Sequence, residues 1–236
     1  MLIEGRVLKG LLLAVLLLPG VVMAGSDQTD PLEGYNRVMF SFNDKADRWV
    51  LKPVAKGYRY VTPDFFERGV SRMFSNLGEV LNVANDLLQG KVGQAGNDGG
   101  RLLINSTIGI AGFFDVAKHA GLEKSDGEDF GQTFGVWGVG EGAYVVLPFL
   151  GPSTLRDAPS LLLDSVFNPI GEVDHVPTRN QLYGTRVVSV RAELLEAEKL
   201  IKGDRYTFIR DVYLQRRQFL VNDGEVEDDF GDDDYN

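Results

Sequence analysis

The chain of 236 residues contains no cysteine. Disulfide bonds and thiolate metal sites are therefore excluded, and we expect the fold to depend on packing and hydrogen bonds alone. The same absence excludes a cysteine nucleophile and, at a processed N-terminus, a thioether-linked lipid.

Histidine is nearly absent as well. The two histidines, His119 and His175, lie outside any H-E-x-x-H pattern or other spacing typical of metal ligands. A G-x-S-x-G nucleophile motif is also missing. We therefore expect surface or structural roles for both histidines, and we predict no metal, no cofactor and no catalytic residue.

Positive charge is scarce relative to negative charge: 24 Lys and Arg residues stand against 34 Asp and Glu residues, for a formal net charge of -10. Much of the acidity lies in residues 222–236, "NDGEVEDDFGDDDYN". Because like charges repel, we expect this acidic tail to be disordered. The tail lacks the regular spacing of a calcium loop, and the chain lacks a basic patch, which argues against a nucleic-acid partner.

Residues 1–24 have the pattern of a secretory signal peptide. Arg6 and Lys9 precede an apolar stretch over 11–18, and small or aliphatic residues follow up to Ala24. An uncleaved membrane anchor is the alternative, although the stretch is short for a span of about 20 residues. Beyond residue 24 no apolar run is long enough to cross a bilayer, so we expect no single membrane-spanning helix there.

Residues 25–221 are predicted to form one all-α domain, because they show neither an internal repeat nor a Pro/Gly/Ser linker. In "DPLE", Asp30 is the expected N-cap and Pro31 the first helical residue. Apolar residues then recur every three or four positions up to Trp49. Pro53 is expected to end or kink this helix.

Later segments continue the helical pattern. Thr62 is the expected cap of a second helix that extends to Gly90. Residues 90–100, "GKVGQAGNDGG", are predicted to be a flexible turn between helices. Further helices are expected within 96–121, over 175–203 and over 204–224, the last of these capped by Asp204, and strand patterns are limited to 144–147 and 187–190.

Residues 131–157, "GQTFGVWGVGEGAYVVLPFLGPSTLRD", are rich first in glycine and then in aromatic and apolar residues. Because glycine loses unusual backbone freedom on ordering, we expect the first half to resist helix and strand. The glycines do not match a phosphate-binding loop, since the Gly-Lys-Ser/Thr sequence and the dinucleotide pattern are both missing. The segment therefore folds against a protein core or lies in lipid.

Core packing and lipid contact are both consistent with the apolar residues. Stripes at helical spacing usually face a protein core, and this interpretation explains most of them. Lipid contact is favoured where aromatic residues gather near glycines, because Trp and Tyr combine an apolar ring with a polar group that stays in water. Short capped helices can lie in one leaflet, since their backbone groups are paired internally. The aromatic group comprises Phe113, Phe114, Phe130, Phe134, Trp137, Tyr144 and Phe149.

Three stretches resemble the MlaA (VacJ) family of Gram-negative outer-membrane proteins: "DPLEGYNRVMFSFND", "LLINSTIGIAGFFDVA" and "EDFGQTFGVWGVGEGAYVVLPFLGPSTLRD", with "NPI" following later. The resemblance extends from about Asp30 to Phe219. It implies a ring-like assembly of amphipathic helices that lies in the periplasmic leaflet of the outer membrane around a central amphipathic channel. It also implies a non-enzymatic function, the removal of mislocalised phospholipids from the outer leaflet to maintain lipid asymmetry.

The resemblance further implies four partners: phospholipid, the outer membrane, a trimeric porin, and a soluble periplasmic lipid-binding carrier of an ABC transport system. A downhill passage of lipid needs no catalytic residue. Arg156 and Asp157 fit either a polar channel wall or a structural ion pair, and the sequence leaves this open. The residues expected to contact lipid or the channel are Phe113, Phe114, Trp137, Tyr144, Phe149, Arg156 and Asp157.

One departure from the family concerns attachment to the membrane. Family members typically carry a lipobox cysteine just after the leader, where this chain has Gly25 or Ser26. Attachment is then expected to depend on the helices, on porin contact or on a retained leader. Two alternative functions are a periplasmic lipid hydrolase that uses Asp126, Glu128 or Asp129, and a porin-associated structural protein that transports nothing.

Overall fold

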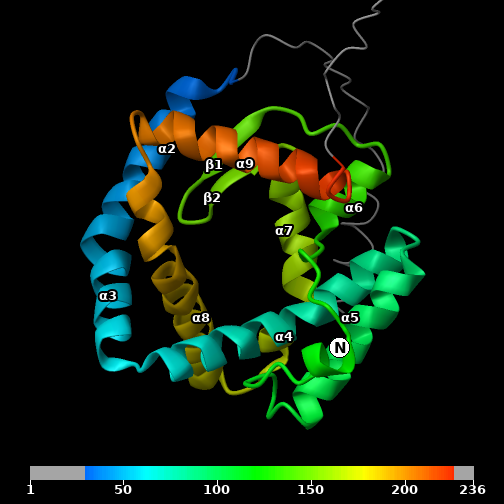
Figure 1. Cartoon of the computed structure of the whole chain (residues 1–236). Coiled ribbons are helices and arrows are strands. Elements are labelled where there is room, and N and C mark those ends of the chain that lie inside the picture. Colours follow the sequence, from blue (N-terminus) through cyan, green and yellow to red (C-terminus); the bar gives the residue numbers. More distant parts are fainter. Residues whose placement is uncertain (1–29, 226–236) are drawn as a thin grey trace, which may run out of the picture.

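The computed structural model describes residues 30–225 (Figure 1). The predicted leader and most of the predicted acidic tail lie outside the described residues, so these boundaries stay predictions. The prediction of an all-α fold is confirmed, with one short hairpin as the strand content of residues 30–225. The elements in chain order are α2 (Glu33–Ala46), η1 (Asp47–Leu51), α3 (Lys52–Val61), α4 (Asp64–Leu88), α5 (Val92–Thr107), η2 (Ala117–Ala120), α6 (Phe130–Val136), β1 (Tyr144–Leu147), β2 (Gly151–Thr154), α7 (Asp157–Val166), η3 (Pro169–Glu172), α8 (Val176–Ala197), η4 (Glu198–Leu200) and α9 (Arg205–Val221).

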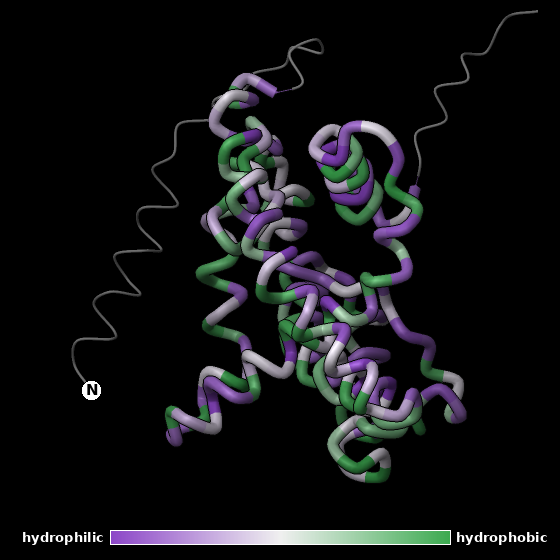
Figure 2. Tube along the Cα trace, turned by 90° about the vertical axis from the view of Figure 1, so that its left-hand side faces the viewer, coloured by the Kyte–Doolittle hydropathy of each residue, from purple (hydrophilic) through white to green (hydrophobic). Residues whose placement is uncertain are grey.

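The helices follow a ring-like outline in Figure 1. Helix α3 forms one side, α4 the base, α5 and α6 the opposite side, and α9 the top, while α7 and α8 close the inner edges. Hydrophobic and hydrophilic residues alternate along these helices in Figure 2 instead of separating into wholly apolar helices. Within residues 30–225, no helix combines the length and apolar character that a bilayer crossing requires.

The first helix begins later than its sequence predicts. Helix α2 starts at Glu33 without a side-chain cap, so the assignment of Asp30 as N-cap is wrong. Asp30 instead accepts a hydrogen bond from Asn36 Nδ2 at 2.8 Å and another from the Tyr206 hydroxyl of α9, which ties the two ends of the domain together. The chain then passes through the π-helical η1 into α3, and this wider turn accommodates Pro53, which cannot donate a backbone hydrogen bond.

The prediction that Thr62 caps the second helix is also wrong, because α4 begins at Asp64. Three other segments form helices where the sequence predicts a turn, a strand or irregular structure. Residues 92–100 belong to α5 instead of a turn, and residues 187–190 belong to α8 instead of a strand. The glycine-rich residues 131–136 lie in α6. The common reason is tertiary contact: α5, for example, buries Ala95, Asp98 and Arg101 along one face, and this burial offsets the entropic cost of its glycines.

The hairpin agrees with the prediction for residues 144–147. Strands β1 and β2 pair antiparallel with Tyr144 opposite Thr154 and Leu147 opposite Gly151. The hairpin packs on α2 and α9 at the top of the ring. It is thereby placed between the first and last helices of the described chain.

Buried side chains are more often polar than apolar. Among the described residues, eleven apolar side chains are buried against eighteen polar or charged ones. Since the apolar core is this small, the fold depends on the pairing of its buried polar groups. One apolar cluster joins α3 to α8 and another joins the hairpin to α9: Ala55, Ala192 and Leu195, and Tyr144, Val146 and Tyr206.

The packing of α4 on α5 shows how such pairing works. The buried guanidinium of Arg101 donates to both carboxylate oxygens of Asp115 at 3.1 Å and to the backbone oxygen of Leu122 at 2.6 Å. Its Nε lies 3.6 Å from Glu79 of the facing helix. Asn105 donates to Asp115 at 3.1 Å and accepts from the backbone of Ala117 at 2.9 Å. These contacts fix the loop after α5 against the two helices.

The side chain of Asp86 in α4 lacks such pairing. It is fully buried, and neither carboxylate oxygen has a hydrogen-bond partner within residues 30–225. Burial raises the pKa of Asp86 to about 7, with further increase from the charges of Asp98 and Glu128 and opposition from Lys91. The folded protein therefore keeps a proton on Asp86 at pH values where the unfolded chain has lost it.

Replacing Asp86 by asparagine is expected to stabilise the fold at high pH. Because the pKa of Asp86 is raised on folding, the wild type loses stability as pH rises from about 4 to about 7, and D86N lacks this loss. At pH 8 the gain is at most about 4 kcal/mol, and it disappears near pH 4. Denaturant unfolding at several pH values measures it, with D126N at an exposed carboxyl as control. An advantage of D86N that did not vary with pH would contradict the assignment.

Alanine substitutions at Gly69 and Gly78 of α4 test the packing of Phe113 on this helix. A Cβ at Gly69 would lie 2.1 Å from the ring of Phe113, whereas a Cβ at Gly78 would meet nothing within 4 Å. We expect G69A to lower the free energy of unfolding by about 1–3 kcal/mol, because the ring must move. G78A should raise it by up to about 1 kcal/mol through helix propensity. Equal effects of the two substitutions would show that Phe113 does not pack on α4 as described.

Candidate functional site

The candidate site is built from α6, the hairpin and the start of α7, the segment that contains most of the predicted contact residues. In Figure 1 this segment lies between α9 and the inner edge of the ring. Helix α6 packs on α7 and α9, and the hairpin on α2 and α9.

Arg156 and Asp157 belong to a buried ion network. Arg156 Nε donates to Asp157 Oδ1 at 2.7 Å, and Arg217 Nε of α9 lies 2.8 Å from Asp157 Oδ2. Arg217 also donates to both carboxylate oxygens of Asp129, at 2.5 and 2.9 Å. The Tyr213 hydroxyl completes the network by donating to Asp157 at 3.0 Å. Arg156 and Asp157 therefore form a buried ion pair.

The two arginines keep Asp157 ionised in spite of its burial. Burial alone would raise the pKa of Asp157, but the hydrogen bonds and charges of Arg156 and Arg217 outweigh burial and hold the pKa below its usual value. Asp157 is therefore ionised near neutral pH, and its negative charge offsets part of the positive charge of both arginines. Asp129 adds a second function, because its side chain caps α6 by accepting from the backbone of Gln132 at 2.8 Å.

Two glycines of α6 make room for this network. A Cβ at Gly131 would lie 2.5 Å from Asp157 Oδ1 and 2.6 Å from Arg217 Nη2. A Cβ at Gly135 would lie 2.9 Å from Arg156 Nη1. The glycine-rich sequence thus does not prevent a helix; it lets a helix approach two guanidinium groups.

Two asparagines of α2 hold the hairpin. Asn36, fully buried, donates to the backbone oxygen of Tyr144 at 3.0 Å and accepts from the backbone of Val146 at 2.8 Å. Asn43 donates to the backbone oxygen of Leu147 at 2.9 Å and accepts from the backbone of Phe149 at 2.7 Å. These bonds fix β1 and the turn of the hairpin on α2.

Tyr144 lies in the protein core. Its side chain is 2% exposed and packs with the rings of Tyr206 and Tyr213. This burial leaves Tyr144 no surface to offer a lipid, and we no longer count it among the contact residues. Tyr144, Val145 and Val146 are all buried, so both faces of β1 are covered, and this depends on helices that are distant in the sequence.

Phe149 and Trp137 are exposed. Phe149 lies in the turn of the hairpin, is 77% exposed, and touches Phe42 edge to face at 5.0 Å between ring centroids. The Trp137 ring is also exposed, while its Nε1 donates to the backbone oxygen of Leu88 at 3.2 Å. Both residues thus present apolar rings outward from anchored backbone.

Phe113 and Phe114 lie outside this segment, against the first turn of α4. They form an aromatic cluster with Phe65 and Phe66, with ring centroids 5.1 to 6.0 Å apart. The neighbouring loop presents Ile110, which is exposed although its φ is 54°, a value that β-branched residues rarely adopt. The predicted contact residues therefore occupy two separate regions instead of one site.

The acids of the hydrolase alternative have structural partners. Glu128 accepts from Lys91 at 2.9 Å and from Gln89 at 2.8 Å, and Asp129 is held by Arg217. Asp126 is exposed. Within residues 30–225, no three His, Cys, Asp or Glu side chains are placed to hold a metal ion.

The sequence reasoning missed the residues that organise this site. Arg217 and Asp129 are 88 positions apart, and Asn36 and Val146 are 110 apart. Asp129 has a local signal as an N-cap three residues before Gln132. Its partner Arg217 has none, because an arginine in an amphipathic helix usually faces solvent. The burial of Asn36 within the first apolar stripe is likewise not predictable from the sequence.

Comparisons with known proteins agree with this arrangement. The profile of the family described as MlaA lipoprotein matches residues 28–220. The chain is 36% identical over 227 residues to the intermembrane phospholipid transport system lipoprotein MlaA of Shigella flexneri, covering 93% of this chain and 90% of the relative. The protein of the same name from Escherichia coli (strain K12) gives the same values. That of Haemophilus influenzae is 34% identical over 206 residues, covering 85% of this chain and 82% of the relative.

A solved structure described as the structural basis for maintenance of bacterial outer membrane lipid asymmetry has the same fold. It matches with a TM-score of 0.73 and 33% sequence identity, and the match covers 83% of this chain and 100% of that chain. The likeness therefore covers most of the chain and is one of fold as well as sequence. On sequence and fold together, the chain belongs to the MlaA lipoprotein family.

Proposed function

We propose that this protein is a phospholipid transport component of the outer membrane, which removes mislocalised phospholipids from the outer leaflet and passes them to a periplasmic carrier. The observation that carries the proposal is the match, over 93% of the chain, to relatives named as intermembrane phospholipid transport lipoproteins. The related solved structure, which concerns outer membrane lipid asymmetry, supports the same function.

The distribution of apolar residues supports a position within one leaflet. Large apolar side chains are exposed on α3, on the loop after α5, at the hairpin turn and on α7, while polar side chains fill the interior. An apolar exterior around a polar interior is costly in water and favourable in lipid. Exposed examples are Trp49, Tyr60 (91%), Val61, Ile108, Ile110 (65%), Phe149, Leu150 and Leu162.

The ring provides the proposed path for the lipid headgroup. In this proposal the helices surround an amphipathic channel, and the network of Arg156, Asp157 and Arg217 fixes its wall without meeting the lipid itself. Phe149 and Trp137 contact the acyl chains, and Phe113 and Phe114 support the loop that enters the leaflet. A trimeric porin and the soluble periplasmic carrier of an ABC transport system are the proposed protein partners.

Substitutions at Ile110 test whether the loop after α5 lies in lipid or in water. In water, replacing a β-branched residue at positive φ by aspartate or asparagine relieves strain, so I110D and I110N should be neutral or stabilising. In lipid, I110D places a charge among acyl chains at a cost of about 2.5–3.5 kcal/mol at full depth. We expect I110D to weaken flotation with phospholipid vesicles and I110N to weaken it less.

The matched control is I110L, which keeps the apolar surface and should float like the wild type. If I110D floats like the wild type while its fold is intact, the loop after α5 does not enter lipid, and the proposed leaflet position is wrong.

The transport function itself is tested in cells. Deleting the gene is expected to increase the phospholipid that is accessible at the cell surface, because nothing then removes it from the outer leaflet. The wild-type gene should restore the low level, and D126N should restore it equally, since no carboxylate chemistry is needed. An unchanged surface level on deletion would favour a purely structural protein, and failure of D126N would favour the hydrolase.

A further inference from the structure

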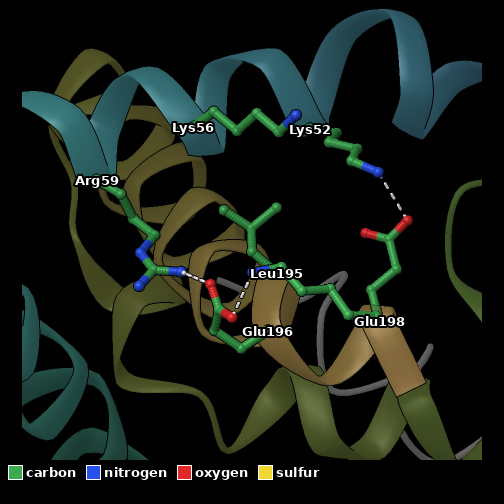
Figure 3. Close-up of a pocket in the computed structure, with 7 residues that line it drawn as sticks. Lys52, Lys56, Arg59, Leu195, Glu196 and Glu198 are labelled. Carbon is green, nitrogen blue, oxygen red and sulfur yellow. Dashed lines mark hydrogen bonds and ion pairs between the residues drawn. The ribbon is translucent and has the colours of Figure 1, made fainter. Parts of the chain in front are cut away.

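A cavity outside the candidate site lies between α3 and α8. The two helices touch through Ala55, Ala192 and Leu195, whose small or compact side chains allow a close approach. Beside this contact lies a surface cavity of about 480 Å³, open on one side, whose volume falls in the usual range of small-ligand sites, roughly 300–1,000 Å³. Figure 3 shows α3 and α8 on opposite sides of it, with Leu195 between them.

The cavity carries an excess of positive charge. Lys52, Lys56 and Arg59 line it from α3 and Lys199 from η4, against the two acids Glu196 and Glu198. Spacings of three and four residues place the three α3 cations on one face of that helix, as Figure 3 shows.

Both acids are already neutralised by pairing. Glu198 accepts from Lys52 at 2.8 Å and from Arg191 at 2.6 Å, and a third cation, Arg205, lies at 3.0 Å. Glu196 is paired with Arg59 at 3.4 Å and with Lys199 at 2.6 Å. Glu67, Asp47 and Asp44 also pair with Arg59, Arg191 and Arg205, so the network of pairs includes every lining cation except Lys56.

Lys56 is the cation without a partner. It is exposed and makes no ion pair with any residue of the described range 30–225. Its side chain runs along α3 toward Lys52 over the mouth of the cavity in Figure 3. An anion in the cavity would thus meet the Lys56 ammonium without having to break an existing pair.

Exposed apolar side chains flank the cavity. Tyr60 of α3 and Leu194 of α8 each adjoin a lining residue, and Leu200 ends η4. A soluble anion would gain nothing from these side chains. A molecule with a charged head and apolar chains would contact both parts at once, as lysine side chains do when they reach from an apolar surface to a lipid phosphate.

We propose that the cavity between α3 and α8 binds the headgroup of an anionic phospholipid, whose acyl chains lie on the apolar faces of the two helices. This site is separate from the hairpin and the ion network, and it rests on the proposed position of the protein in a leaflet. It makes the protein selective for headgroups of net negative charge. The decisive group is Lys56, because its charge is the one not used within the fold.

The test is a lipid titration of the purified whole chain in detergent. Phosphatidylglycerol and phosphatidylcholine with identical acyl chains are compared by native mass spectrometry, and inorganic phosphate is added in a third arm. We expect the wild type to prefer phosphatidylglycerol, and K56Q, which keeps most of the side-chain stem, to lose about five-fold in affinity for it. Affinity for phosphatidylcholine should not change, and K56R should restore the preference.

The control is K124Q, which removes an exposed charge elsewhere and should bind like the wild type. The proposal is overturned if the wild type shows no preference, if K56Q and K124Q behave alike, or if inorganic phosphate displaces phosphatidylglycerol at equal concentration, which would indicate a free-phosphate site. These outcomes are independent of the cellular measurement of surface phospholipid. The lipid site can therefore fail while the transport function stands, and the reverse.

Discussion

Arg217 connects the parts of the molecule that the ring must hold together. Its guanidinium, from α9, reaches Asp129 at the start of α6 and Asp157 at the start of α7, and Asp157 in turn binds Arg156. Three helices and the end of the hairpin thus meet at one buried cluster. Because removing one partner of such a cluster leaves an uncompensated buried charge, the cluster tolerates little rearrangement. The glycines at 131 and 135 are required by the same cluster, since any side chain there would occupy the space of a guanidinium.

A lipid environment would explain both the polar interior and the apolar exterior. A protein in water buries apolar groups and exposes polar ones, whereas here buried polar residues outnumber buried apolar residues. In lipid the exposed apolar side chains need no cover, and the polar groups are paired inside the protein. The cysteine-free sequence fits this picture, because hydrogen bonds and ion pairs between distant segments take the place of disulfide bonds.

Much of the fold was predictable from the sequence, because the spacing of apolar residues determines helices. The all-α class, the strand at 144–147 and the cap of α9 by Asp204 are confirmed. The family resemblance of the three quoted stretches is confirmed as well.

Local rules failed where tertiary contact decides the structure. Asp30 has a tertiary partner instead of a cap, and residues 92–100 and 131–136 form helices despite their glycines. The ion network was not predictable, because Asp129 and Arg217 are brought together only by the whole ring. The burial of Tyr144 was not predictable for a related reason, since the rings that cover it, Tyr206 and Tyr213, come from α9.

The central claim is that the apolar outer surface lies in lipid, and the absence of cysteine allows a direct measurement. Single cysteines at positions 60, 108 and 150, and at 124 as a polar reference, can each carry a spin label without background labelling of the chain. In vesicles of outer-membrane phospholipids, collision rates with oxygen and with a water-soluble nickel complex report the depth of each label. The account predicts high oxygen and low nickel accessibility at 60, 108 and 150, and the reverse at 124. High nickel accessibility at all four positions would contradict it.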